Sequence, residues 1–224
     1  MLSQLSKFFH RYSLDSTLFI IYAYLCFLAF ILSHHGVHIS LIWNIFLAVL
    51  PLVLANLFVS RTRKFPKILF LILWLLFLPN AFYVLTDFIH LTDISFFTDS
   101  YYRLNETQYI LDITPWIELL TIALGFLIAT YYGVKSSIII FKYYFKQNPT
   151  VARVGILIVA FLVGLATYIG RFLRFNSWDI LHPIQLISDL AHSFSLFAFQ
   201  FTCLFAFFFL ATFLFALALS RQEK

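Results

Sequence analysis

The stretch Leu78–Leu91, LPNAFYVLTDFIHL, joins an apolar helical pattern to a cluster of polar side chains. Proline lacks the backbone N–H that a helix interior needs, so we expect the helix to break at Pro79. Polar residues follow at spacings of three and four, and on an α-helix they share an arc of roughly 80°. These residues are Asn80, Tyr83, Asp87 and His90. The stretch therefore predicts an apolar helix that carries one polar stripe near its end.

The composition of the whole chain is that of a polytopic membrane protein. Its 224 residues are 62% hydrophobic and 11% charged, whereas a soluble domain has about 25% charged and about 45–50% apolar residues. The formal net charge is +5, but the basic residues lie in short loops between apolar runs. This distribution is typical of membrane topology signals and not of a nucleic-acid-binding surface.

Six apolar runs are long enough to cross a bilayer as helices. We expect an all-α helix bundle that forms a single integral membrane domain over residues 1–224, its third helix broken at Pro79. The fourth helix is expected to continue beyond its span to Lys146, and Pro149 to end it. Gly155 and Gly164 are expected to let a neighbouring helix approach closely. The predicted spans are 17–33, 40–59, 67–87, 113–132, 151–169 and 194–219.

The basic residues divide unequally between the two sides of these six spans. Twelve of the 15 Lys and Arg lie at the N-terminus, in 60–67, in 133–153 and at the C-terminus. Lys and Arg accumulate on the cytoplasmic side, so we predict a bacterial inner (cytoplasmic) membrane protein with both termini in the cytoplasm. Eight of ten acids and six of seven His lie towards the other side. That asymmetry predicts a polar site on the extracytoplasmic face.

Asp87 and His90 are the residues that we predict to act as acid and base in this site. An acidic side chain near a membrane span favours an interior position with a partner. In the functional interpretation, Asp87 and His90 line a pocket that opens outward. In the structural interpretation, Asp87 ends the helix and His90 lies in the interface.

A second polar segment, GRFLRFNSWD, lies at residues 170–179. Its arginines contradict the charge bias of that side, so we expect a partner to hold them there, either Asp87 or Asp179. The local alternative is that a residue of this segment caps a short helix, with Asp179 in its first turn and Trp178 as an interfacial anchor. The candidate ligand-binding residues here are Arg171, Arg174, Asn176, Trp178 and Asp179.

The spacing Asp-x-x-His occurs three times, at Asp87/His90, Asp179/His182 and Asp189/His192. On a helix such pairs share one face, as in carboxylate-bridged metal sites. Two-residue matches are frequent by chance, and His182 precedes a proline, which disfavours a helix there. We therefore assign no metal ligands, and the sequence identifies no cofactor.

Three stretches together resemble the bacterial multi-pass membrane proteins of domain-of-unknown-function family 1361. They are residues 43–48 (WNIFLA) with Pro51, then LPNAFYVLTDFIHL, then GRFLRFNSWD. Phe82 stands where the resemblance implies a second proline. The resemblance implies a multi-pass inner-membrane protein and no particular activity. It selects Trp43, Asn44, Pro79, Asn80, Tyr83, Asp87, His90, Arg171, Arg174, Asn176, Trp178 and Asp179.

The leading functional hypothesis is recognition and processing of a polar or anionic lipid or glycan head group. Asn44, the polar stripe, Glu118 and the two arginines would converge on it, with Arg171 and Arg174 contacting the anion. One alternative is a small-solute transporter. Another is a non-catalytic partner subunit of a second membrane protein, in which an Asp–Arg pair is a structural lock. The expected surroundings in each case are the lipid bilayer, without nucleic acid.

Overall fold

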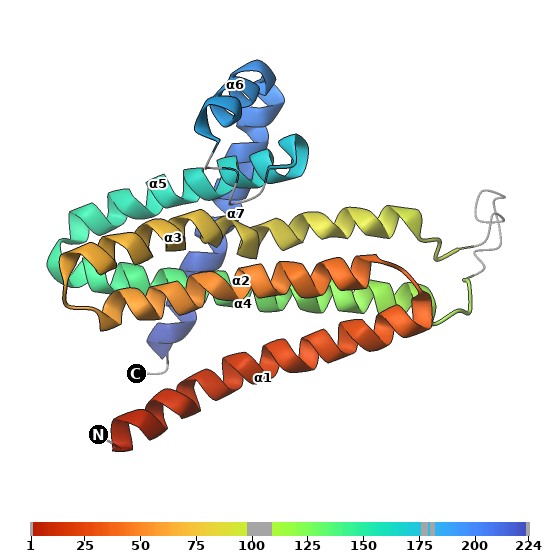
Figure 1. Cartoon of the computed structure of the whole chain (residues 1–224). Coiled ribbons are helices and arrows are strands. Elements are labelled where there is room, and N and C mark those ends of the chain that lie inside the picture. The colour runs from red at the N-terminus through yellow and green to blue at the C-terminus, as the bar shows by residue number, and fades with distance from the viewer. Residues whose placement is uncertain (1, 98–108, 176–178, 180–181, 223–224) are drawn as a thin grey trace. The chain divides into compact units, whose positions relative to one another are not determined.

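The computed structural model describes residues 2–97, 109–175, 179 and 182–222, and nearly all of them are helical. Figure 1 follows the helices along the chain. Two short segments differ from α-helices: η1 is a 3₁₀ helix and η3 is a π-helix. The elements are α1 (Leu2–Ser33), α2 (Val37–Ser60), α3 (Lys64–Tyr83), η1 (Val84–Asp93), α4 (Thr114–Gln147), α5 (Pro149–Tyr168), η3 (Ile169–Leu173), α6 (Pro183–Ser193) and α7 (Leu196–Gln222).

Six helices are long and apolar enough to cross a membrane, which confirms the predicted all-α polytopic architecture. The third is longer than predicted because η1 continues it to Asp93, and the helix of the fourth continues to Gln147. The short amphipathic helix α6 was not predicted; it lies within the segment expected to connect the last two spans. The spans are Leu14–Ser33, Val37–Ser60, Lys64–Asp93, Thr114–Gln147, Pro149–Leu173 and Leu196–Ser220.

The break expected at Pro79 occurs one turn later. Pro79 lies inside α3, which ends at Tyr83, and the 3₁₀ helix begins at Val84. A 3₁₀ helix has about three residues per turn, so side chains three apart lie directly above one another. The polar stripe is therefore not continuous on one α-helix. It is α-helical at Asn80 and Tyr83, and 3₁₀ at Asp87 and His90.

The chain divides into two compact units. Unit 1 comprises Met1–Phe46 and Val84–Ile128, and unit 2 comprises Leu47–Tyr83 and Ala129–Lys224. The helices α2 and α4 each supply residues to both units, so the units are not successive domains along the chain.

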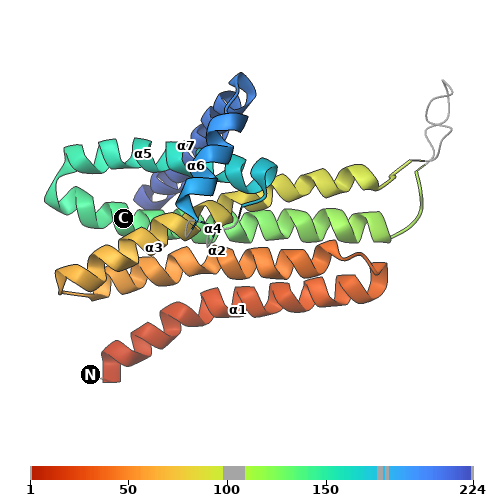
Figure 2. The same ribbon diagram turned by 45° about the horizontal axis from the view of Figure 1, so that its top comes forward.

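In unit 1, helix α1 packs on α4 through a tyrosine and a glycine. The Tyr22 hydroxyl donates a hydrogen bond of 2.9 Å to the Thr121 carbonyl oxygen. A Cβ at Gly125 would lie 2.3 Å from the Tyr22 hydroxyl oxygen. The glycine therefore gives this aromatic side chain room to reach the backbone of α4. Figure 2 shows α1 and α2 joined by a short turn.

In unit 2, helices α5 and α7 approach closely at Gly164. A Cβ there would lie 2.1 Å from the Thr202 carbonyl oxygen, so only glycine fits without movement of the backbone. The predicted close approach at Gly164 is thus confirmed. At Gly155 the nearest atom to an added Cβ, on Phe141, is 3.5 Å away, which is an ordinary contact. Small residues at helix interfaces are how membrane helices gain packing contacts without a hydrophobic driving force.

Candidate functional site

One edge of η1 runs from the interior of the protein to its surface. The 3₁₀ geometry aligns residues 84, 87, 90 and 93. Val84 and Asp87 are buried, His90 is half-buried and Asp93 is exposed. The two residues predicted as acid and base therefore lie one above the other, with the carboxylate inside and the imidazole closer to the surface.

Asn44 of α2 holds the buried carboxylate of Asp87. The side-chain amide of Asn44 donates to Oδ2 of Asp87 over 2.7 Å, and Asp87 is only 4% exposed. A carboxylate inside an apolar protein needs polar partners, since its charge is otherwise costly to bury. The structure thus brings together two predicted site residues that lie 43 positions apart.

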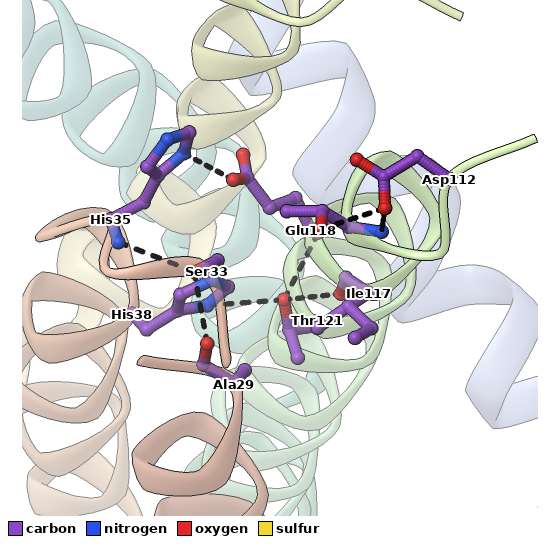
Figure 3. A network of polar contacts seen from close by, with 9 residues as sticks. Ala29, Ser33, His35, His38, Asp112, Ile117, Glu118 and Thr121 are labelled. Carbon is purple, nitrogen blue, oxygen red and sulfur yellow. Dashed lines mark hydrogen bonds and ion pairs between the residues drawn. The ribbon is translucent and has the colours of Figure 1, made fainter. Parts of the chain in front are cut away.

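A second buried carboxylate lies on α4. Glu118 is 2% exposed, and its Oε1 contacts Nδ1 of His35, forming an ion pair when the imidazole is protonated. The His35 side chain is 56% exposed. The pair therefore connects a carboxylate in the interior to an imidazole at the surface. Figure 3 shows the His35 ring directed at the Glu118 carboxylate.

The turn between α1 and α2 places His35 for this contact. Ser33 Oγ donates to the Ala29 carbonyl oxygen over 2.9 Å and accepts from the backbone N–H of His35 over 3.2 Å. His34 has the left-handed φ of 56°, which reverses the chain after α1. Three histidines without a Lys or Arg in SHHGVHIS were the sequence signal for this turn.

His38 lies fully buried beside the same face of α4. Its Nδ1 is 3.3 Å from Thr121 Oγ1, and the Thr121 hydroxyl also lies within hydrogen-bonding distance of the Ile117 and Glu118 carbonyl oxygens, at 2.8 and 3.0 Å. Nε2 of His38 has no hydrogen-bond partner among the described residues. An unpaired polar atom in the interior is costly, so Nε2 is available to a ligand or a water. His35, His38 and Thr121 were not among the predicted site residues.

Asp112 fixes the start of α4. Its Oδ1 accepts hydrogen bonds of 3.0 Å from both the backbone N–H and the hydroxyl of Thr114. These hydrogen bonds favour the charged carboxylate, so they lower the pKa of Asp112. The cap thereby defines the first turn of the helix that carries Glu118 and Thr121.

Unit 2 contains the other predicted polar group, around the π-helix η3. Nη1 of Arg171 donates to the Tyr83 hydroxyl over a long 3.5 Å. Gly170 leaves ordinary contact space beside the Tyr83 ring, 3.5 Å from an added Cβ. Single π-helical turns within α-helices often occur at functional sites. The structure thus places two predicted residues, Tyr83 and Arg171, side by side.

The remaining predicted residues of that segment are dispersed. Arg174 is exposed and has the left-handed φ of 59°. Asp179 is half-buried, and its carbonyl oxygen accepts from the His182 backbone N–H over 2.9 Å. Asn176 and Trp178 lie outside the described residues. In α3, the Asn80 amide donates to the Phe77 carbonyl oxygen over 3.0 Å, which is a local contact within the last turns of the helix.

Within the described part of the chain, no group of three or more His, Cys, Asp or Glu side chains could hold a metal ion. His182 is the N-cap of α6 and Pro183 follows it, so the Asp179/His182 pair does not lie on one helical face.

Residues 43–212 match the model of a family described as "Protein of unknown function (DUF1361)". No curated protein and no solved structure matches the chain. The matched range contains Asn44, Asp87, Glu118 and Arg171, whereas His35 and His38 precede it.

Proposed function

From the buried carboxylates of this chain, which belongs to the DUF1361 family, we propose that it binds and processes a polar head group in a bacterial cytoplasmic membrane. Membrane insertion follows from the six apolar helices. The proposal adds the orientation and the site. Both termini face the cytoplasm, because 12 of the 15 Lys and Arg lie on that side. The turn at 34–36 and the end of η1 then face outward.

The carrying observation is that unit 1 buries two carboxylates within membrane-spanning helices. Asp87 is 4% exposed and Glu118 is 2% exposed, and each contacts a polar side chain of another segment. Ionisable side chains in membrane spans are costly and are therefore functional candidates. A purely structural core would be served as well by apolar residues of similar volume.

The geometry assigns a role to each group of the site. Asp87, held by Asn44, accepts hydrogen bonds from hydroxyl or ammonium groups of the head group. His90, on the same edge of η1 and closer to the surface, exchanges the proton as acid and base. The Glu118–His35 pair is a second route for a proton, because His35 is in contact with solvent or the interface. Nε2 of His38 supplies a further polar contact.

Arg171 and Arg174 of unit 2 are the groups that we propose to contact an anionic ligand. A guanidinium forms strong, charge-assisted hydrogen bonds with phosphate or carboxylate oxygens. Tyr83 positions Arg171 through its hydroxyl, and Arg174 is exposed.

The test incubates purified protein with vesicles of phosphatidylethanolamine and phosphatidylglycerol and follows head-group composition by mass spectrometry. We expect turnover or selective retention by the wild type. Asp87→Asn, His90→Ala and Glu118→Gln should lower it at least tenfold. Asp93→Asn is the matched control, because Asp93 lies on the same edge of η1 but is exposed. A signal equal in wild type and all three variants would refute the proposed site.

A transporter is distinguished by measuring solute and proton flux in proteoliposomes with the same variants. Flux that depends on Asp87 and Glu118, without any change in lipid head groups, would replace head-group processing by transport. Alkaline phosphatase fused after residue 112 tests the orientation. It should be active only if this loop faces the extracytoplasmic side.

A further inference from the structure

Unit 2 contains an apolar cavity that the proposed head-group site does not use. It has a volume of about 270 Å³ and lies between α3, α4 and α5. Leu71, Trp74, Phe141, Tyr144, Val151 and Gly155 are among its lining residues. This volume is near the lower end of ligand cavities, which span roughly 300–1,000 Å³. It is larger than the small voids normal in packed interiors.

The lining of this cavity favours a hydrocarbon over water. The Trp74 indole N–H donates to Ser136 Oγ over 3.0 Å, so the polar atom of this large side chain is already paired. Dry apolar cavities bind apolar molecules, since water there finds too few polar partners. Val151, in the first turn of α5, is 54% exposed. The cavity therefore reaches the surface at this end.

A basic cluster lies at the same end of unit 2. Residues 61–67 and 142–153 contain seven Lys and Arg and no Asp or Glu. Lys67 precedes Leu71 of the cavity by one helical turn, and Arg153 follows Ala152, another lining residue. Such clusters beside membrane spans attract anionic lipid head groups.

Lys67 is held in a fixed place within this cluster. Its Nζ donates to the Tyr143 hydroxyl over 2.8 Å. It also lies 4.0 Å from the centroid of the Tyr143 ring and 5.1 Å from that of Phe58. Tyr143 is the sequence neighbour of Tyr144, which lines the cavity. An ammonium has three donors, and the tyrosine hydroxyl uses one.

We propose that this cavity binds one acyl chain of an anionic phospholipid, whose phosphate contacts Lys67. The apolar lining accommodates the chain, and the absence of acids at this end selects a negative head group over a zwitterionic one. The cavity holds part of one chain only, so the second chain stays in the bilayer. This site lies entirely in unit 2 and is independent of Asp87, Glu118 and the proposed reaction.

Native mass spectrometry of the purified full chain tests the proposal, with phosphatidylglycerol and phosphatidylcholine added in equal amounts. We expect the wild type to retain phosphatidylglycerol at least fivefold in preference. Gly155→Leu fills the cavity and should lower retention of both lipids at least tenfold. Leu157→Phe is its control, because Leu157 is 60% exposed and does not line the cavity.

Lys67→Gln should abolish the preference for phosphatidylglycerol while retention of phosphatidylcholine stays. The matched control is Lys135→Gln, since Lys135 also donates to a tyrosine hydroxyl, that of Tyr131, at an exposed position. Equal retention of the two lipids by the wild type would overturn the proposal. So would wild-type retention by Gly155→Leu. Elution volume and melting temperature identify a variant that has failed to fold, and Val159→Phe then fills the cavity from a second lining position.

Discussion

Asn44 and Asp87 form a hydrogen bond of 2.7 Å between α2 and η1. The carboxylate is almost completely buried, so the amide is a necessary partner and not a surface decoration. The contact joins the first turns of α2 to the segment that follows the break in the third span. It therefore fixes the position of η1 within unit 1, whether or not Asp87 also binds a ligand.

Exchanging the two groups tests this contact. Asn44→Asp should destabilise the protein by about 2 kcal/mol or more, because it places two carboxylates side by side and removes the donor. The double variant Asn44→Asp with Asp87→Asn restores one amide and one carboxylate, and we expect it to recover most of the loss. Thermal unfolding in detergent measures both variants. A double variant no more stable than Asn44→Asp alone would show that the hydrogen bond does not contribute.

Removing the Asp112 cap should make the protein less stable in a pH-dependent way. The hydrogen bonds from Thr114 hold the pKa of Asp112 in the folded protein below its ordinary value of 3.8. The unfolded chain therefore takes up this proton first as the pH falls. The stabilisation is fully present above about pH 4 to 5 and is lost as the pH falls through the folded pKa.

We expect the difference in melting temperature between wild type and Asp112→Ala to be constant near neutral pH and to shrink below pH 3.8. Thr114→Val keeps the backbone donor and removes only the hydroxyl donor, so it should give a smaller difference. A difference that is the same at pH 3 and pH 7 would contradict the role of the charged carboxylate.

Adding one methyl group to α5 should have opposite effects at two glycines. Gly164→Ala places a Cβ 2.1 Å from a backbone oxygen of α7, so the two helices must separate, at a cost of about 1–3 kcal/mol. Gly155→Ala meets nothing closer than 3.5 Å and gains helix propensity of about 1 kcal/mol. Melting temperatures of the two variants should therefore lie on opposite sides of the wild type. If both fall equally, the close approach is not what limits residue 164.

The spans could be predicted from the sequence because hydrophobic length is a local property. Each of the six runs carries its own signal, and only the ends moved, at Asp93 and Gln147. The change to a 3₁₀ helix after Tyr83 could not be predicted from Pro79 alone, since a proline removes one hydrogen bond without dictating which helix type follows. The π-turn around Arg171 likewise has no local sequence signal.

The site was predictable residue by residue but not pair by pair. Asn44, Asp87 and Glu118 stood out because polar groups are costly in membrane spans. Their partners did not, because partner choice depends on which helix faces meet. His35 and His38 were counted only as part of a histidine-rich turn. One contacts Glu118 and the other Thr121, which lie 83 positions further along the chain in each case.

The His38–Thr121 contact makes the sharpest distinction between a hydroxyl and a methyl group. Thr121→Val keeps the volume of the side chain but leaves the fully buried His38 ring without its one described hydrogen bond, and we expect a loss of about 1–3 kcal/mol. Thr121→Ser retains the hydroxyl and should lose less than half as much. Replacing both partners, with His38→Leu and Thr121→Val, removes both polar groups and should be better tolerated than Thr121→Val alone. Denaturant-induced unfolding of the three variants measures the coupling. Losses that simply add in the double variant would mean that the two side chains do not interact, and Nε2 of His38 would then lose its fixed position in the proposed site.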